Sequence, residues 1–493
     1  MQRPPSGNNT IVTRRTLLQT STAIALGALG TSQYALIAAE AVNVEGLPHQ
    51  ATGMKIGEVT DSSAIVWVRL TQHAKRLPDN DEVLKPLQGN KDGTANADML
   101  PGACPAGHGS VRLLFGQSDD FSDAQTTEWI TVQPAQDGIH QFSLNSLPPD
   151  SIFYLRVECR NAKGENSSSI VTGKFRTAPD ANENIAITSV ILGCHLYEKR
   201  DHADGFTTYE SVAKLKPHFI VQTGDNVYYD RDLGPFSTTI PLARWQWQRM
   251  FSLPRHRALL ENVASYWEKD DHDLLKNDSW PGQTYGQLTY ADGLTVFNHQ
   301  TPSGPLPYRT FRWGKHLQIW LVEGRDYRSK NTDADGPNKT IWGSTQKAWL
   351  KKTLAESNAS WKILISPTPI VGPDRAKKND NHANEAFQQE GDEIRAWIKA
   401  NVADHLIVVN GDRHWQYHSV HPQTGLHEFS AGPTSDGLAE GTPGEDKTYH
   451  RFHRVKGGFI SLAANADKKI RTLAVRHHDI NGTVVHEQVF TRS

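Results

Sequence analysis

Phe219–Asp230, with the sequence FIVQTGDNVYYD, is the stretch that decides the fold. Its first four residues are apolar or β-prone, which is typical of the end of a buried parallel strand. Thr223–Asn226 then predicts a tight turn that places Asp225 at the carboxyl end of that strand, the edge where open α/β sheets bind their ligands. Asp225 and Tyr228 together favour a highly charged metal such as ferric iron. Considered alone, the same residues also fit an ordinary strand-to-loop turn.

The chain after residue 184 alternates between strands and helices around this stretch. The apolar run Ile185–Leu192 predicts a strand buried on both faces, and a helix over Asp204–Leu215 connects it to Phe219–Gln222 as a βαβ unit. Further strands are predicted over Val263–Trp267, His316–Val322, Trp361–Ile365, His405–Asn410, His418–Val420, Leu426–Ser430, Gly458–Ala463, Arg471–His477 and Thr483–Val489. Helices are predicted over Ser344–Leu354 and Asp392–Lys399. The layout predicts two β-rich layers flanked by helices.

Four of the predicted strands end in side chains that can ligate a metal. These ends carry Cys194, Asp225 with Tyr228, Asp270–Asp273 with Asn277, and Asp412 with His414. Because such ends meet along one sheet edge, they predict a metal centre assembled from loops. A carboxylate that bridges two metals about 4 Å apart would help to clamp the attacking and leaving oxygens of a phosphate ester.

Each of these residues also has a structural interpretation. Cys194 could be a small buried hydrophobe, and a solvated acidic turn is the expectation for Asp273 and Asp278. His272 could be an outer donor to the metal ligands. Arg325 and Arg328 could steady a phosphate, but salt bridges to Asp326 or Glu323 would explain them equally well.

From Gly57 to Thr177 the pattern is β, with short runs rich in β-branched and aromatic residues. These runs are Ser63–Leu70, Val111–Phe115, His140–Leu144 and Ile152–Cys159. They predict an immunoglobulin-like sandwich, in which a polar, glycine-rich insert over roughly 72–108 is expected to form a long surface loop. The region has no cluster of catalytic residues, so we expect it to act as a spacer or docking domain.

The amino terminus predicts a twin-arginine export signal over residues 1–41. Arg14 and Arg15 precede a short apolar run, Ala23–Gly30, and small residues around Ala38–Ala41. No apolar stretch reaches the roughly 20 residues that a spanning helix needs. We therefore expect a soluble protein without a stable membrane span, exported through the twin-arginine machinery and periplasmic or secreted.

The overall charge argues against a polyanionic partner. The 493 residues include 22% charged residues and carry a formal net charge of −2. A basic surface for nucleic acid or for an acidic membrane is therefore not expected. The expected partner besides the export machinery is a small molecule.

Taken in order, the motifs at the strand ends resemble the alkaline phosphatase D (PhoD-like) family of calcineurin-like metallophosphoesterases. The similar segments are Gly193-Cys194, Gly224–Tyr228, Asp270–Asp278, Gly343–Leu350, Ser360–Ile363, Gly411–Trp415 and Glu428–Pro433. The resemblance covers nearly the whole chain. It implies an α/β fold class, with an immunoglobulin- or fibronectin III-like β-sandwich over 47–178 and an αββα metallophosphoesterase domain over 184–493.

The resemblance also implies Fe³⁺ with Ca²⁺ alongside, other divalent metals being the alternative. It places Cys194 and Tyr228 on iron and makes Asp225 the bridge. The implied remaining ligands or phosphate contacts are Asp270 or Asp271, Asn277, Asp412 and His414. His272 would stand near the leaving group, which makes His272 and Asn277 the catalytic candidates, and Arg325 with Arg328 the substrate-binding ones.

We therefore expect hydrolysis of small phosphate mono- or diesters by attack of a metal-bound hydroxide or oxo group. A sulfate-ester hydrolase using the same site and a non-catalytic adhesion or phosphate-binding protein of the cell surface are the alternatives. Three departures from the family pattern leave the substrate open. His195 replaces the usual Gln, Glu323 replaces the usual Asp, and Lys378–His382 replaces the usual Trp-Asp-Gly-Tyr.

Overall fold

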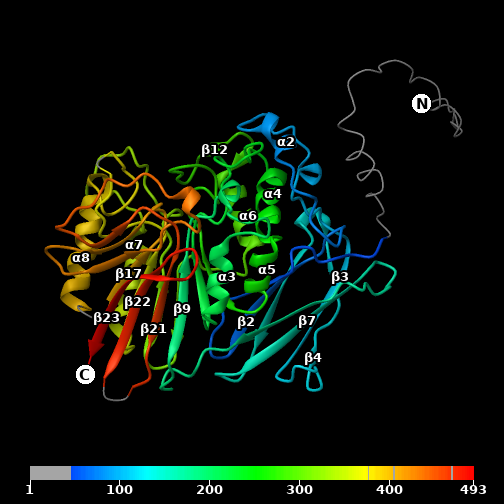
Figure 1. Cartoon of the computed structure of the whole chain (residues 1–493), viewed down its shortest axis with the longest axis horizontal. Coiled ribbons are helices and arrows are strands. Elements are labelled where there is room, and N and C mark those ends of the chain that lie inside the picture. Colours follow the sequence, from blue (N-terminus) through cyan, green and yellow to red (C-terminus); the bar gives the residue numbers. More distant parts are fainter. Residues whose placement is uncertain (1–45, 376, 403–405, 468–469, 493) are drawn as a thin grey trace, which may run out of the picture. The chain divides into compact units, whose positions relative to one another are not determined.

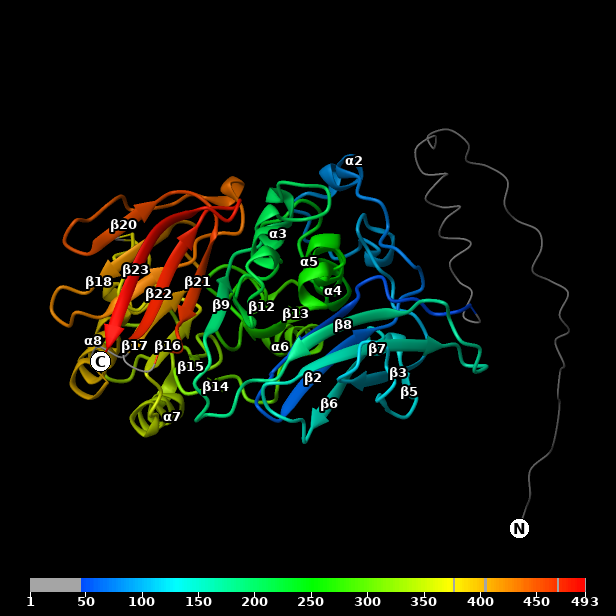
Figure 2. The ribbon, with the colours of Figure 1, turned by 60° about the horizontal axis from the view of Figure 1, so that its bottom comes forward.

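The computed structural model describes residues 46–375, 377–402, 406–467 and 470–492. The predicted export signal over 1–41 therefore lies outside the described residues. Figures 1 and 2 show sheets flanked by helices over most of the molecule, whereas the amino-terminal strands, in blue and cyan, form one side of it. This arrangement confirms the predicted α/β fold class.

The first large sheet has nine strands in the order β23-β22-β21-β9-β10-β11-β1-β2-β6, in which β1 is Met54–Gly57, β2 is Ser63–Arg69 and β6 is Ile139–Asn145. Its centre is parallel and consists of β9 (Ile187–Leu192), β10 (Phe219–Thr223) and β11 (Ala264–Glu268). Every residue of β10 and β11 is buried, which explains why their sequences, FIVQT and ASYWE, lack the strict alternation of apolar and polar residues. Antiparallel strands extend one edge: β21 (Phe459–Ala464), β22 (Arg471–His478) and β23 (Val484–Arg492).

The second large sheet has seven strands in the order β14-β15-β16-β17-β19-β18-β20. The strands are β14 (Arg309–Trp313), β15 (Leu317–Leu321), β16 (Trp361–Ser366), β17 (Leu406–Asn410), β18 (Gln416–Val420), β19 (His427–Ser430) and β20 (His450–Arg454). The middle strands β15, β16, β17 and β19 run parallel. One hydrophobic cluster joins Val221 and Tyr266 of the first sheet to Ile363 and Val409 of the second, so the two sheets pack face to face.

Helices cover the outer faces of both sheets. α3 (Thr207–Lys214), α4 (Ile240–Phe251), α5 (Pro254–Leu260) and α6 (Tyr290–Gln300) accompany the first sheet, and the ribbon β12 (Thr284–Tyr285) with β13 (Leu288–Thr289) precedes α6. α7 (Gly343–Glu356) and α8 (Gln388–Asn401) cover the second sheet. The sequence did not predict α4, because nine of its 12 residues are buried and no polar face marks its period.

The amino-terminal strands do not form a separate hydrogen-bonded unit. β1 (Met54–Gly57), β2 (Ser63–Arg69) and β6 (Ile139–Asn145) continue the nine-stranded sheet, and Ile56 of β1 pairs in parallel with Ala264 of β11. A separate five-stranded sheet completes the sandwich. It consists of β3 (Gly109–Gly116), β4 (Gln125–Thr126), β5 (Ile130–Val132), β7 (Ile152–Arg160) and β8 (Val171–Arg176). The nine-stranded sheet therefore crosses the predicted boundary near residue 180.

The insert over 72–108 differs from the surface loop that its composition predicts. It contains the short helix α2 (Asp81–Leu84) and buries Leu84 and Leu100. These side chains pack with Leu242 and Trp245 of α4, so the insert caps one side of the helical layer. The polar composition of the insert does not predict this contact, because only a few apolar residues of the insert make it.

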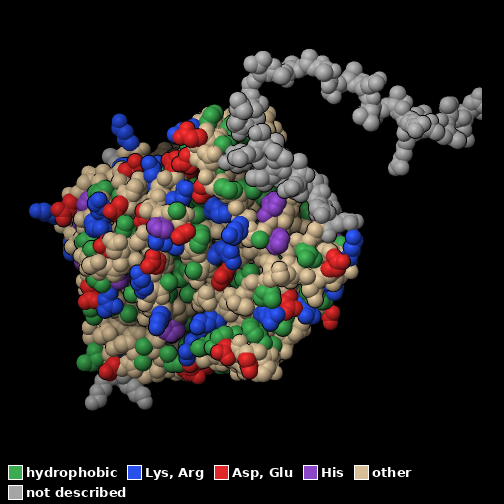
Figure 3. Space-filling model, turned by 45° about the vertical axis from the view of Figure 1, so that its right-hand side comes forward, with side chains coloured by type: hydrophobic (Ala, Val, Ile, Leu, Met, Phe, Trp, Pro, Cys, Tyr) green, Lys and Arg blue, Asp and Glu red, His purple; other side chains and the backbone are tan. Residues whose placement is uncertain are grey.

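The surface carries mixed charge. Figure 3 shows acidic and basic side chains interspersed over one face, and histidine side chains reach the same face. Among the residues that the structure describes, no helix is both long and apolar enough to cross a bilayer.

Candidate metal centre

Three of the predicted ligands directly follow strands and adopt an unusual backbone conformation. Cys194, Asp225 and Asp412 have φ values of 55°, 51° and 62°, in the left-handed region that costs free energy for residues other than glycine. Each directly follows a glycine at the end of β9, β10 or β17. The same sharp turn therefore presents all three ligands.

The glycines allow the strand ends to approach each other closely. A Cβ on Gly411 would lie 2.5 Å from Thr223 Oγ1 and 2.6 Å from the Thr223 carbonyl oxygen. A Cβ on Gly224 would lie 2.6 Å from the Cβ of Asp270. Glycine is thus required at these points for steric reasons, since a side chain would push the ligand loops apart.

Asp225 stands at the centre of the donors. Its Oδ2 accepts a hydrogen bond of 2.9 Å from the Tyr228 hydroxyl and lies 3.5 Å from Cys194 Sγ. The Tyr228 hydroxyl also lies 3.2 Å from His414 Nε2. Three sets of donors have ligand atoms within 4.8 Å of one another: Cys194, Asp225 and His414; Asp225, Asp271 and His272; and Asp225, Asp270 and Asp412. Asp225 belongs to all three sets, which is what a bridging ligand requires.

The donors fit metal ions in charge and in chemistry. Asp225 Oδ1 and Asp270 Oδ2 are buried and have no hydrogen-bond partner, a costly state for carboxylate oxygens that a cation would relieve. The thiol, phenol and imidazole of Cys194, Tyr228 and His414 suit a transition metal, whereas the carboxylates suit a hard cation as well. The residues present therefore match a centre with more than one metal.

Burial shapes the acidity of the donors. It raises the pKa of the Cys194 thiol and of the Tyr228 hydroxyl well above their ordinary values, and the adjacent Asp225 carboxylate adds to both effects. Burial and the charges of Asp271 and Asp270 also raise the pKa of Asp225. A bound cation opposes these shifts because it favours the deprotonated ligand. The centre is thus electrostatically incomplete without positive charge.

The structure distinguishes the two carboxylates between which the sequence left the choice open. Asp270 uses Oδ1 to accept a 2.5 Å hydrogen bond from Arg325 Nε, and its Oδ2 remains for a ligand. Asp271 is held by backbone groups at both oxygens, with distances of 3.0 Å to the nitrogen of His272 and 2.5 Å to that of Asp278. Asp270 is therefore the better placed of the two to bind a metal.

Asp273 is not the solvated residue that the sequence predicts. It is fully buried, and its Oδ1 accepts a 2.7 Å hydrogen bond from the backbone of Asp270. Its Oδ2 accepts from the backbone and side chain of Asn226, at 3.1 and 2.6 Å. Asp273 thus ties the loop after β11 to the loop after β10. The acidic run conceals this role because sequence spacing does not show which carboxylate turns inward.

The two catalytic candidates meet at Asp230. His272 Nδ1 lies 2.5 Å from Asp230 Oδ1, and the backbone nitrogen of Asn277 donates to Asp230 Oδ2 at 2.8 Å. Burial lowers the pKa of His272, but the carboxylates of Asp230, Asp271 and Asp225 outweigh it and raise that pKa to about 10. The Asn277 side chain is exposed and donates to Asp278. Asp230 was not singled out from the sequence, although it closes the deciding stretch.

A cavity of about 160 Å³ opens beside these donors. Five predicted residues line it: Asp225, His272, Asn277, Asp412 and His414. Three cationic side chains also line it: Arg231 and Arg375, which the sequence did not single out, and Lys378 of the segment Lys378–His382. The cavity therefore combines candidate metal ligands with positive charge, a combination suited to an oxyanion.

Arg325 and Arg328 lie outside the lining of this cavity. Arg325 is fully buried behind the ligands, where it binds Asp270 and lies 3.7 Å from Asp271 Oδ2. Arg328 is also buried and donates to the backbone oxygen of Asp380. Both guanidinium groups brace the loops that carry or surround the ligands. The sequence showed that they follow a strand end but not which way they turn.

The three departures from the family pattern have different consequences. His195 is buried against Tyr209, 3.1 Å from its hydroxyl, and burial lowers the pKa of His195 to about 3. The Glu323 carboxylate accepts the backbone hydrogens of Arg325 and Asp326, both at 2.7 Å, and so shapes a turn. Of the three, only the segment Lys378–His382 reaches the cavity, through Lys378.

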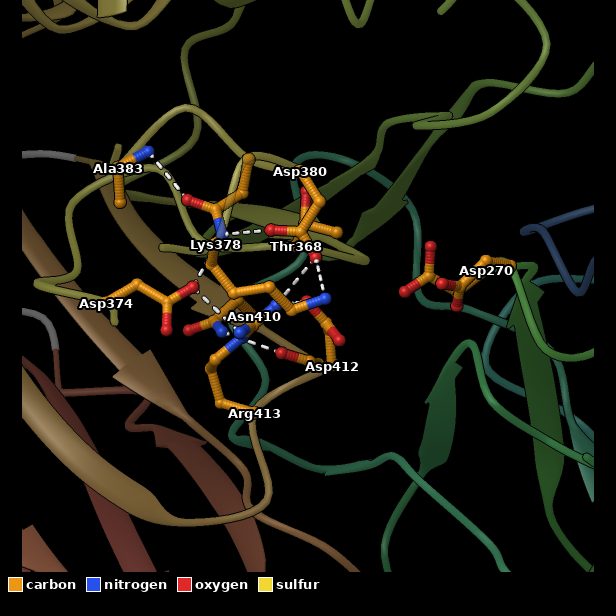
Figure 4. A network of polar contacts seen from close by, with 12 residues as sticks. Asp270, Thr368, Asp374, Lys378, Asp380, Ala383, Asn410, Asp412 and Arg413 are labelled. Atoms are coloured by element: carbon orange, nitrogen blue, oxygen red, sulfur yellow. Dashed lines mark hydrogen bonds and ion pairs between the residues drawn. The ribbon is translucent and has the colours of Figure 1, made fainter. Parts of the chain in front are cut away.

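An ion-pair network holds that segment against the ligand loop after β17 (Figure 4). The Arg413 guanidinium lies 2.7 Å from Asp374 Oδ2 and 3.2 Å from Asp380 Oδ2, and it also pairs with Asp412. Lys378 Nζ in turn lies 2.7 Å from Asp380 Oδ2. One buried arginine therefore connects a candidate metal ligand to the wall of the cavity.

Comparison with known families gives matches to two family models. Residues 189–478 match the model of the PhoD-like phosphatase, and residues 38–179 match that of the PhoD-like phosphatase N-terminal domain. Alkaline phosphatase D of Bacillus subtilis (strain 168) is 22% identical over 453 residues, which cover 80% of this chain and 70% of the relative. Tartrate-resistant acid phosphatase type 5 of Oryctolagus cuniculus is 24% identical over 178 residues, 35% of this chain and 50% of the relative.

Two of the solved structures that resemble this chain superpose over most of its length. The structure of PhoD superposes with a TM-score of 0.67 at 17% sequence identity, covering 90% of this chain and 89% of the other. The purple acid phosphatase from yellow lupin (Lupinus luteus) seeds superposes with a TM-score of 0.61 at 13% identity, covering 89% of this chain and 74% of the other. At these identities the likeness concerns the fold.

Proposed function

The chain belongs to the PhoD-like phosphatase family, and from this premise we propose that it is a metal-dependent hydrolase of small phosphate mono- or diesters. The observation that carries the proposal is the position of Asp225, which is shared by three sets of donors beside a cavity with cationic walls. Fe³⁺ would be held by Cys194, Tyr228 and His414, with Asp225 as the bridge. Ca²⁺ or another divalent metal would be held on the side of Asp270 and Asp412.

The bound metals would supply Lewis-acid activation of the ester and of the attacking water. The protein contributes the remaining functions. Arg231 and Arg375 give the cavity positive charge, which raises the local concentration of an anionic ester. The exposed amide of Asn277 can donate to an oxygen of the phosphoryl group. His272, oriented by Asp230, is placed to give a proton to the departing oxygen.

The proposal is tested on native protein isolated after export. We expect iron and a divalent metal by elemental analysis and an absorption band in the visible from tyrosinate and thiolate bound to iron. Tyr228→Phe should bleach or shift that band. A colourless protein with stoichiometric iron would refute the ligation by Tyr228.

Matched esters separate the proposed reaction from its alternatives. Phenyl phosphate should be hydrolysed, and phenyl sulfate should be hydrolysed far more slowly. A preference for the sulfate would establish the sulfatase alternative. Metal-free native protein with no turnover of either ester would instead favour a binding or adhesion role.

We also propose that the chain is exported by the twin-arginine machinery and works in the periplasm or outside the cell. Arg14 and Arg15 support this proposal. Replacing both with lysine should retain the protein in the cytoplasm, as measured by cell fractionation. Unchanged export of that variant would contradict the assignment.

A further inference from the structure

Two guanidinium groups border the cavity beside Glu440 and Gly441. Arg231 lies on one side, with its Nη2 2.8 Å from Glu440 Oε1. Arg375 lies close to the next residue, because a Cβ added to Gly441 would stand 3.1 Å from Arg375 Nη1. The same glutamate oxygen is 3.9 Å from His414 Nδ1. Both guanidinium groups therefore stand near the candidate ligand His414.

The charges of these two arginines are only weakly neutralised. The Glu440 side chain that pairs with Arg231 is 59% exposed, and exposed pairs of this kind contribute little. Within the described residues, the acidic partner of Arg375 is Asp374, at 3.4 Å from its Nε. Asp374 is itself committed to Arg413 and to Asn381, at 2.7 and 2.8 Å. Either arginine can therefore exchange its present contact for an anion from a ligand.

Lys378 offers a contrast on the same wall. Its ammonium group lies 2.9 Å from Asp278 and 2.7 Å from Asp380, so two carboxylates already compensate its charge. The lysine fixes the wall, whereas Arg231 and Arg375 keep their binding capacity. A planar guanidinium also matches a carboxylate or phosphate with two parallel hydrogen bonds, which an ammonium group cannot do.

Arg375 is carried by an anchored segment and lies near a buried ring. Its guanidinium lies 5.8 Å from the centre of the Trp415 ring, and Trp415 is buried. The adjacent Asp374 is anchored by the buried Arg413, which also pairs with Asp412 (Figure 4). The backbone that carries Arg375 is thus anchored beside the candidate ligand Asp412, whereas the Arg375 side chain is 39% exposed and can reach an anion in the cavity.

We propose that Arg231 and Arg375 form a second anion-binding subsite, which selects phosphate esters whose organic part carries a further anionic group such as a carboxylate or a second phosphate. This inference rests on the proposed function. The scissile phosphate would lie at the metal ligands, and the second anion would lie at the two guanidinium groups. Neutral esters would use the same reacting centre but lack the added contact.

The test uses the metal-loaded protein and two esters with leaving phenols of similar acidity, phenyl phosphate and 3-carboxyphenyl phosphate. We expect the carboxylated ester to have the higher kcat/KM. Arg375→Gln and Arg231→Gln should each lower kcat/KM for the carboxylated ester about tenfold more than they lower it for phenyl phosphate, tenfold being the size of one charge-assisted hydrogen bond. Lys377→Gln is the matched control, because this exposed lysine is in the same loop and is not among the residues that line the cavity.

A binding measurement separates this inference from the proposed function. Calorimetry with 3-carboxyphenylphosphonate and phenylphosphonate, which are not hydrolysed, should show the same selective loss in both variants. Equal losses on both esters would overturn the inference, since the arginines would then act on the transferring phosphoryl group. Unchanged selectivity in both variants would also overturn it. Wild-type protein that hydrolyses neither ester but binds the carboxylated phosphonate selectively would refute the phosphatase function and leave the subsite standing.

Discussion

Replacing Asp225 with asparagine should change stability in opposite directions with and without metal. Asparagine keeps the shape of the side chain and an oxygen that can accept from Tyr228, but it removes the charge that Asp270 and Asp271 repel. In metal-free protein we therefore expect the variant to be more stable. In metal-loaded protein we expect it to be less stable, because the residue shared by all three donor sets no longer binds cations well.

The magnitudes follow from the environment of Asp225. Asparagine carries no charge and so escapes the burial and repulsion that raise the pKa of Asp225, which should add about 1–3 kcal/mol to the unfolding free energy of the metal-free protein. In the loaded protein, losing a metal present at a thousand times its Kd removes about 4 kcal/mol. Nearly all phosphoesterase activity should disappear with the metal.

The stability of the metal-free protein should also depend on pH. Burial and neighbouring carboxylates raise the pKa of Asp225 above its ordinary value of 3.8, so the metal-free native state retains a proton that the unfolded chain releases. Stability therefore falls as the pH rises above that value and through the raised pKa. The asparagine variant should lack this fall, and its advantage should vanish at lower pH.

The assay is urea unfolding of chelator-treated and metal-loaded protein over a range of pH, together with elemental analysis. Asp119→Asn serves as the control, since Asp119 is exposed, lies between β3 and β4, and belongs to none of the three donor sets. A metal-free Asp225→Asn variant that is less stable than the wild type would refute the electrostatic argument. Full metal content and normal turnover would refute the bridging role.

Two further predictions concern the centre. His272→Ala should retain its metals and slow the hydrolysis of alkyl phosphates by about 10²–10⁴-fold. It should slow the hydrolysis of nitrophenyl phosphate far less, because that leaving group needs little protonation. Equal losses on both substrates would show that His272 does not donate a proton to the leaving oxygen. Gly411→Ala should cost about 1–3 kcal/mol and lower the metal content, because its Cβ would meet Thr223 at 2.5 Å. Gly304→Ala is the control, with its nearest contact at 3.4 Å, and equal metal content in both variants would show that the close approach is not needed.

Much of the strand framework could be predicted from local pattern. The expectation for Phe219–Gln222 differs from β10 by one residue, and that for Trp361–Ile365 differs from β16 by one residue. Strands buried on both faces appear as unbroken apolar runs, so their ends are visible in the sequence. The pattern failed for α4, where nearly every side is buried, and for the insert over 72–108, where a few apolar residues make the contact.

The sequence by itself determined the candidate metal ligands, because each lies in a short motif at the end of one strand. A glycine followed by Cys194, Asp225 or Asp412 is a local arrangement, and a local arrangement is visible in a linear chain. It also indicated the family, since several such motifs occur in a fixed order.

Only the tertiary structure decided how the side chains around these ligands are used. The register between β10 and β11 and the packing of the two sheets set which carboxylate keeps a free oxygen, and Asp270 does so whereas Asp271 is held by backbone groups. The same packing buries Arg325 behind the ligands and brings Arg231 and Arg375 to one cavity from loops 144 positions apart (375 minus 231). Charge, burial and access at such a site depend on segments that are distant in sequence, and no local pattern encodes their distances.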